Sequence, residues 1–173
     1  RDKTNLNIRI IRLGTVLGKG IIKIDNEILH ELVKDATQKP QITIKGEGLD
    51  IHNIIDEQDA VYGILKLSFS DKTKGEVVTL ANKNNYTTLS IAYKLLELNT
   101  EAQSIKFVEN PERDFIVQDL YVPAPHASKY GWIQQSTLEE TMIDQIHTYY
   151  DDINKEWNHN LEPSKKTIEN VKK

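Results

Sequence analysis

The sequence of 173 residues contains no cysteine, which excludes disulfide bonds and thiolate metal sites. It also lacks an excess of positive charge, since 22 Lys and Arg stand against 26 Asp and Glu and the net charge is -4. Nucleic acids and anionic membranes attract clustered Lys and Arg, so we expect neither as a partner. No apolar run reaches the roughly 18–20 residues of a membrane-spanning helix. With no secretory signal either, the sequence predicts a cytoplasmic location.

Strand-like and helix-like segments alternate along the chain, which predicts an α/β protein with some parallel strands. β-branched or alternating patterns predict strands at residues 8–13, 42–44, 51–55, 77–81 and 105–108. Apolar residues at helical spacing predict helices at residues 24–36, 56–67, 88–96 and 138–153. Asp56 is the expected N-cap of the second helix, and Ser136 with Glu139 forms the expected capping box of the last. Residues 154–173 are polar and predict a helical or frayed tail.

The first predicted strand indicates that part of the fold is supplied from elsewhere. It is apolar on both faces, and such a strand needs cover on both sides. The chain also begins with Arg1 rather than Met, and the strand-like run starts within a few residues. We therefore expect a chain cut inside a larger protein, with processing as the alternative.

Five segments, in this order, resemble the extended short-chain dehydrogenase/reductase family, the NAD-dependent sugar-nucleotide epimerases and dehydratases. They begin with Arg12-Leu13-Gly14-Thr15-Val16-Leu17-Gly18, which is similar to the family's Arg-Leu-Gly-Asn-Val-Tyr-Gly. The others are residues 40–48, 52–60 and 75–82, and Tyr130-Gly131-Trp132 followed by residues 136–140. The match runs from about residue 8 to about residue 151.

The resemblance implies a division of labour between two parts of the protein. It implies that an N-terminal part binds NAD or NADP on a Gly-rich turn and carries the catalytic Tyr-x-x-x-Lys pair. The C-terminal part grips the nucleotide diphosphate and the sugar. Residues 1–153 would be that substrate-binding part, the last strands of a Rossmann-type sheet plus a small α/β lobe, with residues 154–173 as the tail. The intact protein would be an NAD(P)-dependent epimerase or dehydratase, and this chain alone would be inactive and would not bind the cofactor strongly.

Two alternatives remain open for the function. One is a non-catalytic ligand-binding or regulatory module with the same fold, and the other is a related reductase of a non-sugar substrate. The partners implied by the leading interpretation are a nucleotide sugar and the missing N-terminal part. An exposed strand edge would also promote self-association or a homodimer.

Thr15 and His52 are the expected substrate contacts, and both depart from the family pattern. The family commonly places Asn where Thr15 stands, and Arg, which pairs with phosphate, where His52 stands. A histidine has no guanidinium fork and carries full charge only below about pH 6.5. The substitutions indicate either that the phosphate is bound at a different place in the site or that the protein takes a different substrate.

Two arginines complete the candidate site. Arg113 falls near the family's Arg-Pro-Gly-Asp segment, whose Arg reaches nucleotide phosphates; the alternative is a loop pair with Asp114 or Glu112. Arg12 is the candidate cofactor contact, near the nicotinamide end, although anchoring of the strand–loop junction is the alternative. The five histidines show no His-x-x-x-His spacing, so we expect no metal site.

Tyr62 and Lys66 satisfy the Tyr-x-x-x-Lys spacing, but they follow the Arg-Leu-Gly strand, whereas the family's catalytic pair precedes it. We interpret them as a surface pair on a helix, with Lys66 extending to water. Trp132 and Tyr149 are expected in the core.

Overall fold

The computed structural model describes residues 7–21, 23–24, 26–98, 101–110 and 126–161. The order of elements confirms the α/β class. The strands are β1 (Ile10–Leu13), β2 (Thr15–Leu17), β3 (Gln41–Lys45), β4 (Ile51–His52), β5 (Ile54–Asp56), β6 (Val77–Leu80), β7 (Tyr86–Thr87) and β8 (Ser104–Val108). The helices are α1 (Glu27–Gln38), α2 (Glu57–Ser68), α3 (Thr88–Leu98) and α4 (Leu138–Leu161), with short 3-10 helices η1 (Asp71–Thr73) and η2 (His126–Tyr130).

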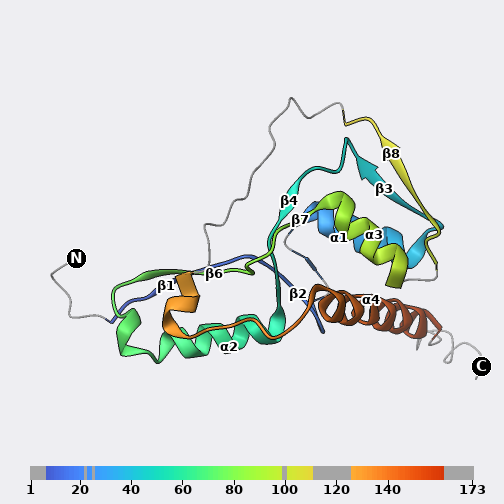
Figure 1. Ribbon diagram of the computed structural model, residues 1–173. Helices are drawn as coiled ribbons and strands as arrows, with labels where there is room; N and C mark the ends of the chain where they lie inside the picture. The colour runs from blue at the N-terminus through green and yellow to red at the C-terminus, as the bar shows by residue number, and fades with distance from the viewer. Residues whose placement is uncertain (1–6, 22, 25, 99–100, 111–125, 162–173) are drawn as a thin grey trace, which may run out of the picture.

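The strands pair two by two, and most pairs are parallel. β1 runs parallel to β6, β2 to β5 and β3 to β8, whereas β4 and β7 are antiparallel. The parallel β1–β6 pair with α2 on one face corresponds to the expected last strands of a Rossmann-type sheet (Figure 1). α1, α3, β3 and β8 form a separate lobe beside it (Figure 1).

Each of the two regions has an apolar core. In the lobe, α1, α3 and α4 bury Leu29, Leu32, Ile91, Leu95 and Met142. Beneath β6, α2 and the segment after η2 bury a second set, which comprises Ala60, Leu67, Val78, Leu80 and Trp132. The expected burial of Trp132 and Tyr149 is confirmed, at 3% and 7% exposed. Burial raises the pKa of Tyr149 to about 12, and its hydroxyl lies against His30 Nδ1, which joins α4 to α1.

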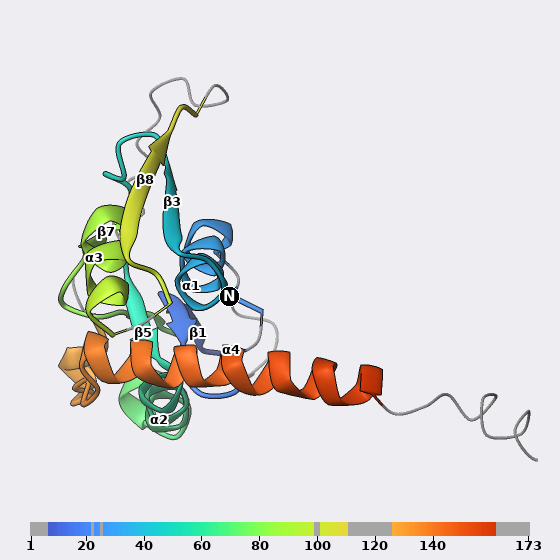
Figure 2. The same ribbon diagram turned by 90° about the vertical axis from the view of Figure 1, so that its right-hand side faces the viewer.

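α4 packs in the core of the lobe, and its far end projects beyond the other elements (Figure 2). The helix continues through residue 153 to Leu161, so its backbone shows no break at the expected start of the tail. Residues 162–173 lie outside the described part of the chain. None of the helices described is both long and apolar enough to cross a bilayer.

Three local predictions are wrong. The strand predicted at residues 51–55 is interrupted at Asn53, because β4 pairs with β7 and β5 pairs with β2. Residues 15–17 form a strand that the sequence pattern did not indicate. The capping box of α4 lies one residue later than predicted, since Thr137 and Glu140 bond each other's backbone N–H groups at 3.2 and 2.8 Å.

Candidate substrate-binding site

Gly14 and Thr15 lie where the parallel strands β1 and β6 end. The N–H of Gly14 donates to the carbonyl of Leu80 at 3.1 Å, and the N–H of Thr15 donates to the carbonyl of Asn53 at 2.8 Å. Open α/β sheets bind ligands at the carboxyl ends of their strands. The structure therefore places Thr15, half-buried, at the edge where a ligand is expected.

Asn53 organises this edge from the gap between β4 and β5. Its side chain is buried, and its Nδ2 donates to the carbonyl of Asn82 and to Oδ1 of Asn85, both at 2.8 Å. Its Oδ1 accepts from the N–H of Asn82 at 2.9 Å. Asn53 thus fixes the turn after β6 through its side-chain amide, and it fixes Thr15 through its backbone carbonyl.

The same residue explains why glycine follows β1. A Cβ on Gly14 would lie 2.7 Å from Oδ1 and 2.9 Å from the carbonyl oxygen of Asn53. Real Cβ atoms do not approach backbone this closely, so the glycine of the Arg-Leu-Gly segment is required by packing against Asn53.

His52 is buried, with both ring nitrogens beside polar partners. Oδ1 of Asn26 accepts from the N–H of Leu29 as the N-cap of α1, which directs Nδ2 of Asn26 to Nδ1 of His52 at 3.4 Å. Nδ1 is therefore assigned as the acceptor, and Nε2–H donates to the hydroxyl of Thr88 at 2.8 Å. A contact between Nε2 and a phosphate requires His52 to exchange Thr88 for the phosphate.

Of the two candidate arginines, the structure describes the position of Arg12 only. Arg12 is exposed on β1, next to the Gly14 turn. Arg113 lies outside the described residues, so its proximity to Thr15 stays a prediction.

The turn after β2 is tied to α4 and to the start of α2. The N–H of Gly18 donates to Oε1 of Gln145 at 3.0 Å, and Gly18 has a φ of 138°. A Cβ there would lie 2.6 Å from Cγ of Glu57. Burial, then the carboxylates of Asp56 and Asp144, raise the pKa of Glu57, whereas Lys19 opposes the shift. Gly18 therefore lies in a packed turn.

Tyr62 and Lys66 lie on the outer part of α2. Lys66 Nζ is 3.2 Å from the hydroxyl of Tyr62 and 5.4 Å from the centre of its ring. Half of Tyr62 is exposed, which agrees with the surface interpretation of this pair.

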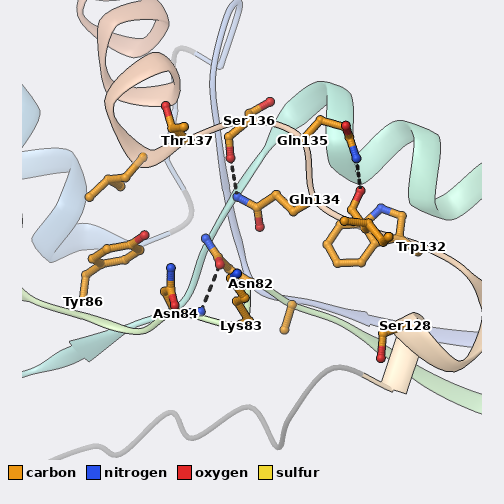
Figure 3. Close-up of a pocket in the computed structure, with 13 residues that line it drawn as sticks. Asn82, Lys83, Asn84, Tyr86, Ser128, Trp132, Gln134, Gln135, Ser136 and Thr137 are labelled. Carbon is orange, nitrogen blue, oxygen red and sulfur yellow. Dashed lines mark hydrogen bonds between the residues drawn. The ribbon is translucent and has the colours of Figure 1, made fainter.

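The sequence interpretation missed Asn53 and Asn82, and it assigned Trp132 to the core alone. Trp132 and Asn82 also line a cavity at the carboxyl end of β6 (Figure 3). A signal for Asn53 was present, because it stands next to His52 where the family's motif has Asp. Elsewhere, no group of three or more His, Asp or Glu side chains in the described part of the chain is placed to hold a metal ion.

No family model and no curated protein matches the sequence, but solved structures match the fold. UDP-glucose 4-epimerase from Thermotoga maritima superposes with a TM-score of 0.70 at 18% identity, over 84% of this chain and 46% of that chain. An epimerase from Methanothermobacter thermautotrophicus gives 0.68 at 18% identity, over 83% and 43%. The NAD complex of dTDP-glucose 4,6-dehydratase from Bacillus anthracis gives 0.62 at 15% identity, over 84% and 45%.

This chain spans less than half the length of each of those three proteins. The neighbours nevertheless include epimerases and a dehydratase of sugar nucleotides, the branch that the motif order resembles. The chain therefore has the fold of part of the NAD-dependent sugar-nucleotide epimerases and dehydratases of the extended short-chain dehydrogenase/reductase type.

Proposed function

We propose that this chain is the substrate-binding part of an NAD(P)-dependent epimerase or dehydratase of a nucleotide-linked sugar. The observation that carries the proposal is the position of Gly14 and Thr15 at the carboxyl edge of the β1–β6 pair, in a fold shared with such enzymes. Thr15 is the proposed contact to the substrate, with its backbone fixed by Asn53. Arg113 is proposed to pair with the nucleotide phosphates.

His52 is proposed to face the same phosphates by exchange of its bond to Thr88. Because an imidazole replaces a family arginine, His52 lacks the fork of a guanidinium group. We expect His52 to bind phosphate more weakly than a guanidinium group would. Arg113 would then contribute a larger share of the phosphate affinity.

The described residues do not fit the pyrophosphate of a dinucleotide cofactor. Such a site needs a Gly-rich turn that leads from a strand into the N-terminus of a helix. The turn after β1 has one glycine, Gly14, and leads into β2. NAD or NADP is therefore proposed to bind to another part of the protein, and no catalytic step is assigned to these residues.

The open flank of the β1–β6 region supports a further part of the protein. Within the described residues β1 has a partner on one edge only, and Ile10 and Leu13 are 52% and 43% exposed. An apolar strand in a parallel sheet is normally covered on both faces. The proposed occupant of this flank is the cofactor-binding part, which would place its nicotinamide near Arg12.

The test is to express the chain joined to the polypeptide encoded before Arg1 in its gene. NAD and NADP are added with UDP-, dTDP-, CDP- and GDP-sugars, and the sugar products are identified by NMR. We expect turnover from the joined protein, none from residues 1–173, and a reduction of at least about tenfold in kcat/KM on Thr15→Ala. Thr43→Ala, on β3, is the matched control.

Turnover by residues 1–173 alone would contradict the proposal. So would an upstream region without a Gly-rich turn and a Tyr-x-x-x-Lys pair. That second outcome would favour a ligand-binding module, to which the contact of His52 with Thr88 already lends support. Turnover of a non-sugar carbonyl compound would instead indicate a related reductase.

A further inference from the structure

α4 carries a row of buried polar side chains. Thr141, Gln145 and Thr148 are 1%, 0% and 7% exposed, and their spacing of four and three residues places them on one side of the helix. Hydrophobic packing alone would favour apolar side chains at such positions, as at Met142 and Ile146 of the same helix. A buried polar row whose members are hydrogen-bonded fixes one arrangement of the groups that it contacts. The contacts of this row therefore show which part of the structure α4 holds in place.

Two members of the row hold the turn that follows β2, which lies beside the first turns of α4 (Figure 1). The turn closes through the N–H of Ile21, which donates to the carbonyl of Gly18 at 3.3 Å. Gln145 accepts from the N–H of Gly18 at 3.0 Å and donates from Nε2 to the carbonyl of Ile21 at 2.7 Å. The hydroxyl of Thr148 accepts from the N–H of Gly20 at 2.9 Å. The two ends of the turn thus meet on a single buried amide.

The third member of the row fixes α4 itself. Thr141 donates to Oδ2 of Asp56 at 3.1 Å, and Oδ1 of Asp56 accepts from the N–H of Gln58 as the N-cap of α2. The start of α2 and the turn after β2 therefore meet the same side of α4. The turn is held by a helix that has its own attachment to the sheet region.

The turn joins the two elements that set the proposed substrate contacts. On one side, β2 begins with Thr15 and packs against both cores, through Val16 and Leu17. On the other side, the chain reaches Asn26, the N-cap of α1, whose Nδ2 lies 3.4 Å from Nδ1 of His52. The position of the turn therefore helps to set the start of α1, and with it His52, relative to Thr15.

We propose that Gln145, together with Thr148, is a positioning residue for substrate binding, which acts through the turn after β2 and touches no reacting atom. The inference rests on the proposed function, in which Thr15 and His52 contact a nucleotide sugar. Two contacts bind one substrate tightly only when their separation is fixed in advance. Loss of the Gln145 amide should therefore weaken substrate binding. The chemical step is not assigned to these residues, so it should be affected less.

The experiment uses the chain joined to the polypeptide encoded before Arg1, with the sugar nucleotide that this joined protein turns over. Gln145→Met keeps the length of the side chain but removes both its donor and its acceptor. We expect KM to rise at least about tenfold, with kcat changed by less than about threefold. Thr148→Val, which removes one hydrogen bond to the turn, should raise KM about threefold. Thr148→Ser retains the hydroxyl and should behave as the wild type.

Two controls separate positioning from a general loss of stability. Ile146→Val alters the next residue of α4, whose apolar side chain makes no hydrogen bond to the turn, so it should lower Tm but leave KM unchanged. Hydrogen exchange of the glycine amides, followed by NMR, measures the turn directly. The N–H of Gly18 should exchange faster in Gln145→Met than in the wild type. The N–H of Gly14, which donates to Leu80, should exchange as before.

Turnover with an unchanged KM in Gln145→Met, or with the same KM in Gln145→Met and Ile146→Val, would overturn this inference and leave the proposed function standing. So would an exchange rate of the Gly18 N–H that Gln145→Met does not alter. If Gln145→Met does not fold, the comparison of Thr148→Val with Thr148→Ser decides, and equal KM values for these two variants would overturn the inference. A joined protein that turns over no sugar nucleotide would remove the proposed function, and this inference with it.

Discussion

At the scale of single residues, one buried amide fixes the geometry of the candidate site. Asn53 uses a donor and an acceptor that no other side chain of its size offers together. Nδ2 faces the carbonyl of Asn82 and Oδ1 of Asn85, while Oδ1 faces the N–H of Asn82. An aspartate has the same shape, but when ionised it has no donor. The site is therefore sensitive to the exchange of a single group.

Asn53→Asp is expected to lower the free energy of unfolding by about 2–4 kcal/mol at pH 7, because a buried carboxylate would face two acceptor oxygens. The loss should shrink toward pH 4, because a protonated carboxyl regains one O–H donor. Urea unfolding at the two pH values measures the effect. Asn85→Asp is the control, since its Oδ1 only accepts from Asn53. Equal stability of the wild type and Asn53→Asp at pH 7 would contradict the assigned role.

The sequence predicts Thr15 and His52 as substrate contacts, and that stays a prediction; it could not predict the hydrogen bonds that the structure shows around them. The bonds of Asn53 reach 29 to 32 residues along the chain, and no local spacing encodes them. His52 illustrates the same limit, since its bond to Thr88, 36 residues away, could not be predicted from the sequence.

At the scale of elements, local chemistry predicted most of the helices and strands. The N-cap of α2 is Asp56, as expected, and it accepts from the N–H of Gln58. The strand at residues 51–55 was predicted as continuous, although the polar His52 and Asn53 separate its apolar residues. Its division at Asn53 depends on two different partner strands, which the pattern does not contain.

The sequence pattern does not decide which residue caps α4, because Ser136 and Thr137 are both followed by Glu three residues later. Thr137→Ala is expected to lower the free energy of unfolding by about 1 kcal/mol, or about 2–4 °C in Tm. Ser136→Ala, the matched control, should have a much smaller effect. Calorimetry of both variants decides, and a greater loss for Ser136→Ala would restore the sequence-based assignment.

The same cap has a pH dependence with a defined sign. The backbone N–H and then the hydroxyl of Thr137 lower the pKa of Glu140 below 4.5. Its stabilising effect is therefore complete above the unfolded pKa and is lost as the pH falls through the folded one. The Thr137→Ala difference should accordingly become smaller in acid.

At the scale of the whole molecule, the described surface carries large apolar side chains outside the two cores. Val61 and Leu65 on α2 and Phe69 at its C-cap recur every four positions and are 55%, 51% and 84% exposed. Apolar stripes on helices normally pack against another element. Within the described residues β1 also has a partner on one edge only. The structural neighbours are matched over less than half of their own length.

Residues 1–173 alone should therefore self-associate through this surface, because apolar patches and open strand edges pair with copies of themselves. Sedimentation velocity at rising concentration should show the weight-average mass increasing above 19.9 kDa. The pair Val61→Glu and Leu65→Lys should remain monomeric and folded, since Glu and Lys four residues apart also favour a helix. Tyr93→Glu, an exposed site on α3, should associate as the wild type does. If the wild-type chain stays monomeric, the exposed apolar residues of α2 do not need to pack against another element. The exposed flank of β1 would then no longer support a second part of the protein.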